Sequence, residues 1–136
     1  MENKVYYVSK MKISENIKNL REDSTIFVVE IDGSTIQNEE EFLVTMSSVF
    51  HFPRPITLRG AYFDVFNDWM RDLDWLGKSG YALIINNFNK FIKNDQTLKK
   101  MIIDLFEELI LPFWEEEVIH TVVEGQAKPF NVFLVD

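Results

Sequence analysis

The chain has 136 residues, a formal net charge of −8 and no cysteine. A length in this range predicts one domain. The acidic balance argues against binding to nucleic acid or an anionic membrane and favours a basic partner, while the absence of cysteine excludes disulfides, thiol catalysis and thiolate zinc sites. No stretch has the apolar core of a signal peptide or the roughly 18 apolar residues of a membrane span, so we expect a cytoplasmic protein.

Residues 1–23 are predicted to form an N-terminal extension in front of a domain of residues 24–136. "VYYV" is compatible with a short strand and "SENIKNL" with a helical turn or two. Tyr6 and Tyr7 are expected to pack this extension onto the main body. The polar run "REDS" then marks a boundary.

The first clear strand is "IFVVEI", which is β-branched and almost wholly apolar, as in a strand buried on both faces. Asp32-Gly33 is a turn signal that ends it. Asn38 is placed to cap a helix whose first turn, residues 39–41, is wholly glutamate, which suits the positive end of the helix dipole. The apolar stripe of that helix is Phe42, Met46, Val49 and Phe50.

After a proline-containing loop, the segment "GAYFDVFNDWMRDLDWL", Gly60 to Leu76, has helical periodicity. At about 100° per residue its apolar side chains share one side. These are Phe63, Phe66, Trp69, Met70, Leu73 and Leu76. Asp64, Asp68 and Asp72 follow the opposite side at i, i+4 and i+8, and Trp75 also falls on this acidic side. A tryptophan on a polar face does not fill the core stripe of its own helix.

The second half of the chain repeats the alternation of strand and helix. "YALIINNF" is a second buried strand, and a long helix then begins at a cap formed by Asn94 or Asp95. Its stripe is Leu98, Met101, Ile102, Leu105, Phe106 and Leu109. Pro112 is expected to end or kink this helix. "VIHTVV" suggests a further short strand, and "PFNVFLV" is the last clear strand.

This order predicts an α/β fold: a small parallel sheet with strands near 26–31, 81–86 and 130–135, joined by right-handed helical crossovers. Met46, Met70 and Met101 are expected to fill gaps in its core. Trp114 is interpreted as a core ring, and His120 as a structural histidine among apolar neighbours.

A carboxylate-dependent enzyme is the first functional alternative, since Asp64 and Asp68 are spaced to share Mg²⁺ or to act as an acid–base pair. Acids at this spacing are usually the solvated face of an amphipathic helix, and His51, the nearest histidine, lies beyond a proline-rich loop. No G-x-S-x-G motif and no glycine-rich phosphate loop occurs. The sequence therefore favours a binding protein without cofactor or metal over an enzyme. Carboxylates around an exposed aromatic are typical of a surface that captures a basic site on another protein.

Two stretches, "FVVEIDGSTIQNEEEFLVTMSSVFHFP" and, five residues later, "RGAYFDVFNDWMRDLDWL", resemble the barstar family, intracellular inhibitors of secreted bacterial ribonucleases. The family pattern is matched at Gly60, Asp64, Asp68 and Asp72-Leu73-Asp74-Trp75. The resemblance covers about residues 24–136. It implies a three-stranded parallel sheet packed on one side by helices, and an antitoxin or immunity role in a bacterium.

The resemblance also implies a contact surface. The acidic helix and the loop before it would plug the active site of a basic ribonuclease, with Asp68 in the place of substrate phosphate and Asp64 one turn earlier. The expected partner-binding residues are Gly60, Tyr62, Asp64, Asn67, Asp68, Asp72 and Trp75. The chain departs from the family at Leu58-Arg59, where an aromatic pair is usual, at Tyr62, and at Asn67, where the family has tryptophan. An immunity or adaptor protein for a different basic toxin is the alternative, because it needs the same acidic surface.

Overall fold

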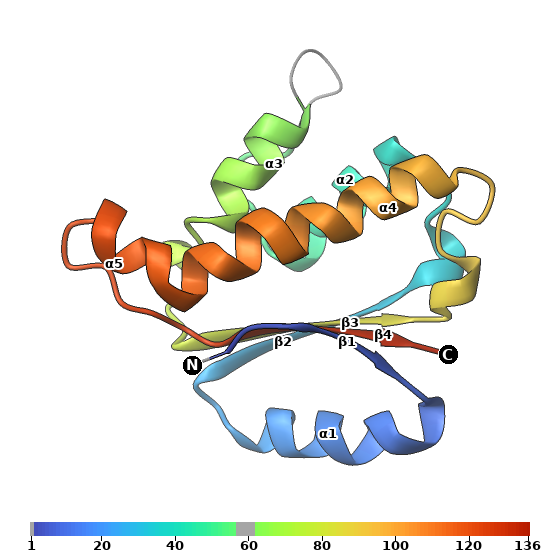
Figure 1. Ribbon diagram of the computed structural model, residues 1–136, viewed down its shortest axis with the longest axis horizontal. Coiled ribbons are helices and arrows are strands. Elements are labelled where there is room, and N and C mark those ends of the chain that lie inside the picture. The colour runs from blue at the N-terminus through green and yellow to red at the C-terminus, as the bar shows by residue number, and fades with distance from the viewer. Residues whose placement is uncertain (1, 57–61) are drawn as a thin grey trace.

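The computed structural model describes residues 2–56 and 62–136, with Tyr62 described by its backbone alone. Figure 1 shows the elements in chain order. They are β1 (Val5–Val8), α1 (Lys10–Glu22), β2 (Ile26–Asp32), α2 (Glu39–Val49), α3 (Tyr62–Met70), β3 (Gly80–Asn86), α4 (Gln96–Leu105), α5 (Val118–Thr121) and β4 (Phe130–Val135). Within these described ranges, no helix is long and apolar enough to cross a membrane.

The sheet has four parallel strands in the order β1-β4-β3-β2. The α/β class and the three predicted strands are confirmed, but a three-stranded sheet is wrong because "VYYV" adds an edge strand. Val5 lies opposite Val132, and Val8 lies opposite Val135. The side chain of Asn3 fastens this strand further, since it donates hydrogen bonds to the carbonyls of Leu111 and Lys128.

Helices cover both faces of the sheet. α2, α3, α4 and α5 lie on one face, and α1 runs across the other on its way from β1 at one edge to β2 at the opposite edge (Figure 1). Ile13 of α1 is buried against Ile84 and Val135. The expectation of helices on one side only is therefore wrong. The central strand β3, covered from both sides, is buried along nearly its whole length, which explains its unbroken apolar run.

The main core lies between the sheet and the four helices on its α3 side. Asn38 caps α2 as predicted, with its Oδ1 accepting a hydrogen bond from the Glu41 amide at 2.9 Å. Phe42 of α2, Phe66 of α3 and Phe106 beyond α4 form a chain of tilted or edge-on rings, with centroids 5.3 and 6.3 Å apart. Aromatic pairs in this arrangement stabilise a fold beyond what the burial of their apolar area contributes. This packing fixes α3 against α2 and α4.

The helix that starts at α4, capped by Asp95, does not end at Pro112. Two π-helical segments, Phe106–Ile110 and Phe113–Glu117, carry the chain on to α5. The wider π turns leave room for a proline that lacks an N–H, and its φ of −62° suits a helix. "VIHTVV" is not a strand, because Val118–Thr121 is helical. His120 is exposed beside Glu116 instead of lying in the core.

Candidate functional site

The acidic helix is shorter than the sequence predicts. α3 ends at Met70, and Trp75 belongs to a separate 3₁₀ turn, Asp74–Leu76. Leu73 sits between the two with a left-handed φ of 56° and is completely buried. The Trp114 indole N–H donates to the Met70 carbonyl at 2.9 Å, which satisfies one of the last acceptors of α3. The prediction of one helix from Gly60 to Leu76 is wrong beyond Met70, because burial of Leu73 redirects the chain.

Asp64 and Asp68 project from α3 as an exposed pair one turn apart. The side chain of Asp68 is 77% exposed, and its Oδ1 lies 3.2 Å from the guanidinium of Arg71. Arg71 also donates to the backbone carbonyl of Asn67 at 3.2 Å. Oppositely charged residues three positions apart on a helix commonly pair, so the sequence itself could have predicted this ion pair between Asp68 and Arg71. The central carboxylate is thus partly neutralised within its own chain.

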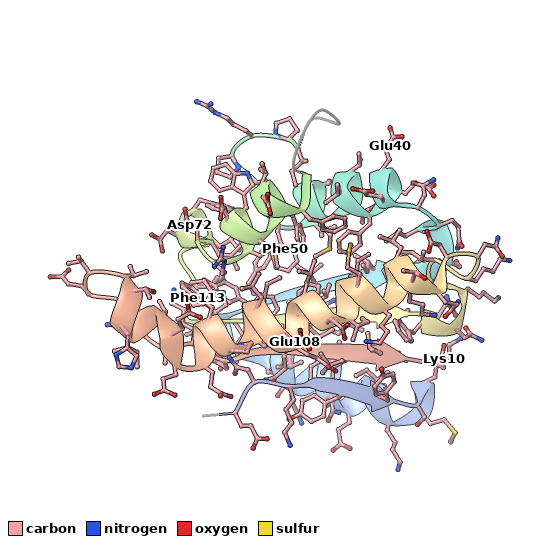
Figure 2. The ribbon with its side chains drawn as sticks, turned by 45° about the horizontal axis from the view of Figure 1, so that its top comes forward. Lys10, Glu40, Phe50, Asp72, Glu108 and Phe113 are labelled. Carbon is pink, nitrogen blue, oxygen red and sulfur yellow. The ribbon has the colours of Figure 1, made fainter. Side chains whose placement is uncertain are left out.

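Asp72 lies past the end of α3, partly exposed, with its Oδ1 accepting a hydrogen bond from the Asp74 amide at 3.2 Å. Figure 2 shows it on the side of the molecule where α3 ends. The row of three aspartates therefore follows the helix for one turn and continues into the turn after it.

Trp75 is not on the polar face of the helix, and that prediction is wrong. Its indole N–H donates to the carbonyl of Phe50, the C-cap of α2, at 2.9 Å. Its ring meets Trp69 edge-on at a centroid distance of 5.3 Å and Phe52 at 6.1 Å. The ring is half-buried, so it braces the turn after α3 against α2 and leaves only part of its surface for a partner.

Three of the expected contact residues need separate comment. Gly60 lies outside the described residues, and Tyr62 begins α3 with its side chain outside them. Asn67 is only 8% exposed, and its Oδ1 accepts no hydrogen bond from any residue that the structure describes. A buried acceptor without a partner is uncommon. The structure thus brings Asp64, Asp68 and Asp72 to the surface and places Asn67 inside.

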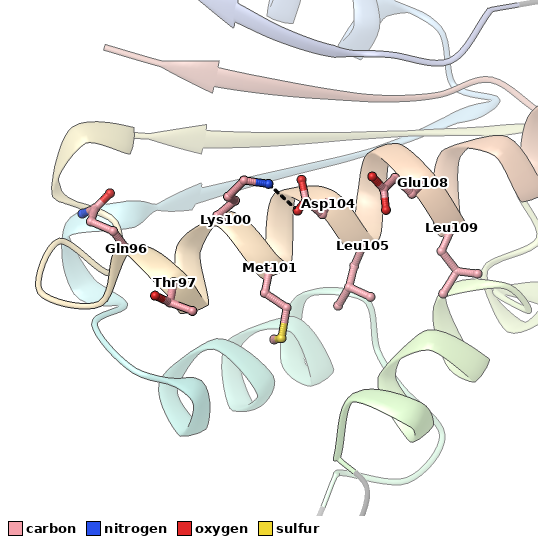
Figure 3. Close-up of a pocket in the computed structure, with 8 residues that line it drawn as sticks. All are labelled: Gln96, Thr97, Lys100, Met101, Asp104, Leu105, Glu108 and Leu109. Carbon is pink, nitrogen blue, oxygen red and sulfur yellow. Dashed lines mark hydrogen bonds and ion pairs between the residues drawn. The ribbon is translucent and has the colours of Figure 1, made fainter.

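A groove of about 680 Å³ follows the outer side of α4 next to α2 and α3. Figure 3 shows Met101, Leu105 and Leu109 pointing from α4 and the segment after it toward the side of α2 and α3. Asp104 and Glu108 form its other rim, and Asp104 pairs with Lys100 at 2.7 Å. Met101 is 38% exposed, so it is not the core residue that its spacing predicts. Met46 and Met70 are fully buried.

Among the residues in the described ranges, no three histidine, aspartate or glutamate side chains converge as a metal site. The exposed side chains described on α3 are two carboxylates, Asp64 and Asp68, and the apolar Val65, with half-buried aromatic rings beside them. Such an arrangement presents fixed negative charge that attracts and orients a positively charged surface.

A sequence model of the barstar family, described as barnase inhibitor, matches residues 26–134. The chain belongs to the barstar family. The match begins at Ile26, so β1 and α1 lie outside it, and it contains α3 and the whole acidic row. No curated protein and no solved structure matches the chain significantly.

Proposed function

We propose that this barstar-family protein binds a basic ribonuclease and blocks its active site with α3 and the segment before it. The observation that carries this proposal is the exposed row of Asp64 and Asp68 on α3, inside a chain whose family is described as barnase inhibitor. A ribonuclease binds RNA phosphate through cationic side chains, so a rigid array of carboxylates is a natural mimic of its substrate.

Asp68 is the central contact in this proposal. On binding, the cations of the ribonuclease replace water around its carboxylate and make charge-assisted hydrogen bonds. The carboxylate of its ion pair with Arg71 is 77% exposed and so is well solvated, which keeps the pair weak and makes its exchange for a better partner inexpensive. Because Phe66 and Met70 hold α3 in the core, the carboxylates are positioned before the encounter.

Around Asp68 we place Asp64, Asp72 and the exposed part of Trp75, with Gly60 and Tyr62 at the start of the contact. Asn67, being buried, acts through the packing of α3. A partner seated on α3 also reaches the adjoining groove along α4.

The bound ribonuclease is the proposed partner, and the protein itself carries out no catalysis. The inhibitory unit is residues 24–136, with residues 1–23 as an extension, and the predicted cytoplasmic location belongs to the same proposal.

The test is direct inhibition. We expect the purified protein to form a one-to-one complex with barnase or with another basic ribonuclease, and to stop its cleavage of RNA stoichiometrically. An acidic ribonuclease is the matched control, since it lacks the positive surface. The proposal fails if no basic ribonuclease is bound. Capture of a basic toxin that does not cleave RNA would instead favour the immunity or adaptor alternative.

A further inference from the structure

β1 is an edge strand that uses one of its two sides. It stands first in the strand order β1-β4-β3-β2, so its neighbour in the sheet is β4 alone (Figure 1). The carbonyl of Lys4 accepts a hydrogen bond from the Val132 amide at 3.0 Å. The carbonyl of Val8 accepts one from the Asp136 amide at 3.2 Å. These bonds fix which residues of β1 face β4.

The amides and carbonyls of Val5 and Tyr7 point away from the sheet. Backbone groups of successive strand residues alternate between the two sides, so those of the intervening residues reach β4 and those of Val5 and Tyr7 do not. In the part of the chain that the structure describes, no backbone group lies bonded to them on that side. An open row of donors and acceptors is a template for a further strand.

β1 lacks the features by which proteins usually protect an edge strand. Its sequence, "VYYV", contains no charge and no proline, and its residue types have high β propensity. Tyr7 is 71% exposed and Tyr6 is 40% exposed. β2, at the opposite edge of the sheet, carries the exposed carboxylates Glu30 and Asp32, and such charges discourage pairing. The edge suited to further pairing is therefore β1.

The distribution of charge indicates that the further strand comes from a second copy of this chain. Residues 1–23 hold five of the 14 basic residues and four of the 22 acidic residues, so this extension is close to neutral. The acidic excess lies in residues 24–136. Two chains that each carry a net charge of −8 repel one another. Because β1 belongs to the neutral extension, two copies that meet there avoid most of this repulsion.

We propose that two copies of the chain pair through β1 as antiparallel strands, which joins their sheets across a two-fold axis. The register centred on Tyr6 sets Val5 of each copy opposite Tyr7 of the other. In an antiparallel ladder such a pair exchanges both of its hydrogen bonds, so all the outward-facing groups of β1 find partners inside the strand. This pairing is independent of the proposed function.

The exposed rings of β1 are positioned for this register. Tyr6 stacks on Phe133 with the centroids 5.3 Å apart, on the side of the sheet that α1 covers. Tyr7 meets Phe88 edge-on at 6.1 Å, on the side of the main core. The two Tyr6 rings therefore face each other on one side of the joined sheet, and each Tyr7 faces Val5 of the other copy on the opposite side. Cross-strand pairs of these types stabilise antiparallel strands.

The dimer should be weak, and it leaves α3 free. β1 has four residues, so we expect the joined surface to fall below the roughly 1,200 Å² of a standard interface and the dissociation constant to lie at about 1–100 µM. α3 follows β2, which lies at the opposite edge of the sheet (Figure 2). Each copy therefore keeps its row of aspartates exposed.

Sedimentation equilibrium tests the dimer. Over about 5 to 500 µM, a range that spans the expected constant, we expect the mass to rise from 16.1 kDa toward twice that value. Tyr7→Pro removes an outward N–H without removing a bond to β4, and Tyr7→Lys adds a charge to the edge. Each should raise the dissociation constant of the dimer at least about ten-fold. Val44→Lys, at a residue 57% exposed on α2, makes the same gain of charge away from β1 and should leave it unchanged.

Amide hydrogen exchange identifies the surface that pairs. We expect the amides of Val5 and Tyr7 to be protected at high protein concentration and unprotected after dilution, whereas the Tyr6 amide, which faces β4, is protected in both. A parent that stays monomeric at about 500 µM would refute the proposal. A dimer that tolerates Tyr7→Lys, or that leaves Val5 and Tyr7 unprotected, would also refute it. None of these measurements involves a ribonuclease, so the proposed function is tested separately.

Discussion

At the scale of single residues, Asp68 should contribute most to binding. We expect Asp68→Ala to raise the dissociation constant for the ribonuclease by about 30-fold or more, because the partner's cations are left buried and unpaired. That corresponds to roughly 2–5 kcal/mol, a range that rests partly on the barnase–barstar pair itself. Isothermal titration calorimetry of variant and parent measures the change.

The side chain of Asp68 is largely exposed, so its removal should not alter folding. Glu15→Ala, an exposed acid on α1, is the control for the loss of one negative charge. Parental affinity in a folded Asp68→Ala variant would show that the acids of α3 are only a solvated helix face.

Asp32, at the end of β2, should make stability depend on pH. Its Oδ1 accepts hydrogen bonds from Asn87 Nδ2 at 2.9 Å and from the Ser34 amide and hydroxyl at 3.0 and 2.7 Å. These bonds, that from Asn87 first, hold the pKa of Asp32 below its usual value. Its contribution to the free energy of unfolding is therefore present above the unfolded-state pKa of about 3.9 and is lost as the pH falls through the lower folded-state pKa.

We expect Asp32→Asn to remove the pH-dependent contribution of this carboxylate to stability. The free energy of unfolding, measured with urea, should then fall less steeply below about pH 4 than in the parent. If the free energy of unfolding falls with decreasing pH as steeply in the variant as in the parent, the three hydrogen bonds do not persist in solution.

At the scale of elements, α1 is held to the sheet by a small cluster in which Ile13 is central. Ile13 is 4% exposed and packs against Ile84 and Val135, with Ile17 at its side. We expect Ile13→Ala to lower the free energy of unfolding by about 2–4 kcal/mol, since it deletes buried methyl groups and leaves a cavity. Chemical denaturation measures the loss.

The exposed neighbour Met11 offers the control, and Met11→Ala should change stability by less than about 0.5 kcal/mol. Because α1 lies on the face of the sheet away from α3, the folded Ile13→Ala variant should bind the ribonuclease as the parent does. Equal stability of the two variants would contradict the packing of α1 on the sheet.

At the scale of the whole molecule, the net charge of −8 should accelerate association with a basic partner. We expect the association rate to fall as salt rises from about 0.05 to 0.5 M, because screening shortens the range of the field to a few ångströms. Glu39→Gln, in the first turn of α2, should lower the association rate at low salt and much less at high salt, with little change in dissociation. Stopped-flow kinetics provide both rates, with Glu15→Gln as the control on the far face. A rate independent of salt would rule out electrostatic steering.

Much of the fold could be predicted because it depends on patterns that are local in the chain. Apolar runs predicted the strands β2, β3 and β4. β3 is buried along nearly its whole length, as a strand covered on both faces must be. β2 lies at an edge of the sheet with Glu30 and Asp32 exposed, so the prediction that it is buried on both faces is wrong.

Asn38 and Asp95 predicted two helix starts, because their side-chain oxygens can accept hydrogen bonds from the first amides of a helix. The i, i+4 spacing predicted the exposure of Asp64 and Asp68 on one face of α3.

Other features depend on contacts between distant segments. "VYYV" becomes a strand because β4, more than 120 residues later, offers it an edge. The helical period of residues 60–76 continues past Met70, but the burial of Leu73 and the Trp114 hydrogen bond end α3 there. Trp75 consequently turns inward to the carbonyl of Phe50. Periodicity describes one isolated helix, whereas the point at which a helix stops depends on whether the core can bury the next side chain.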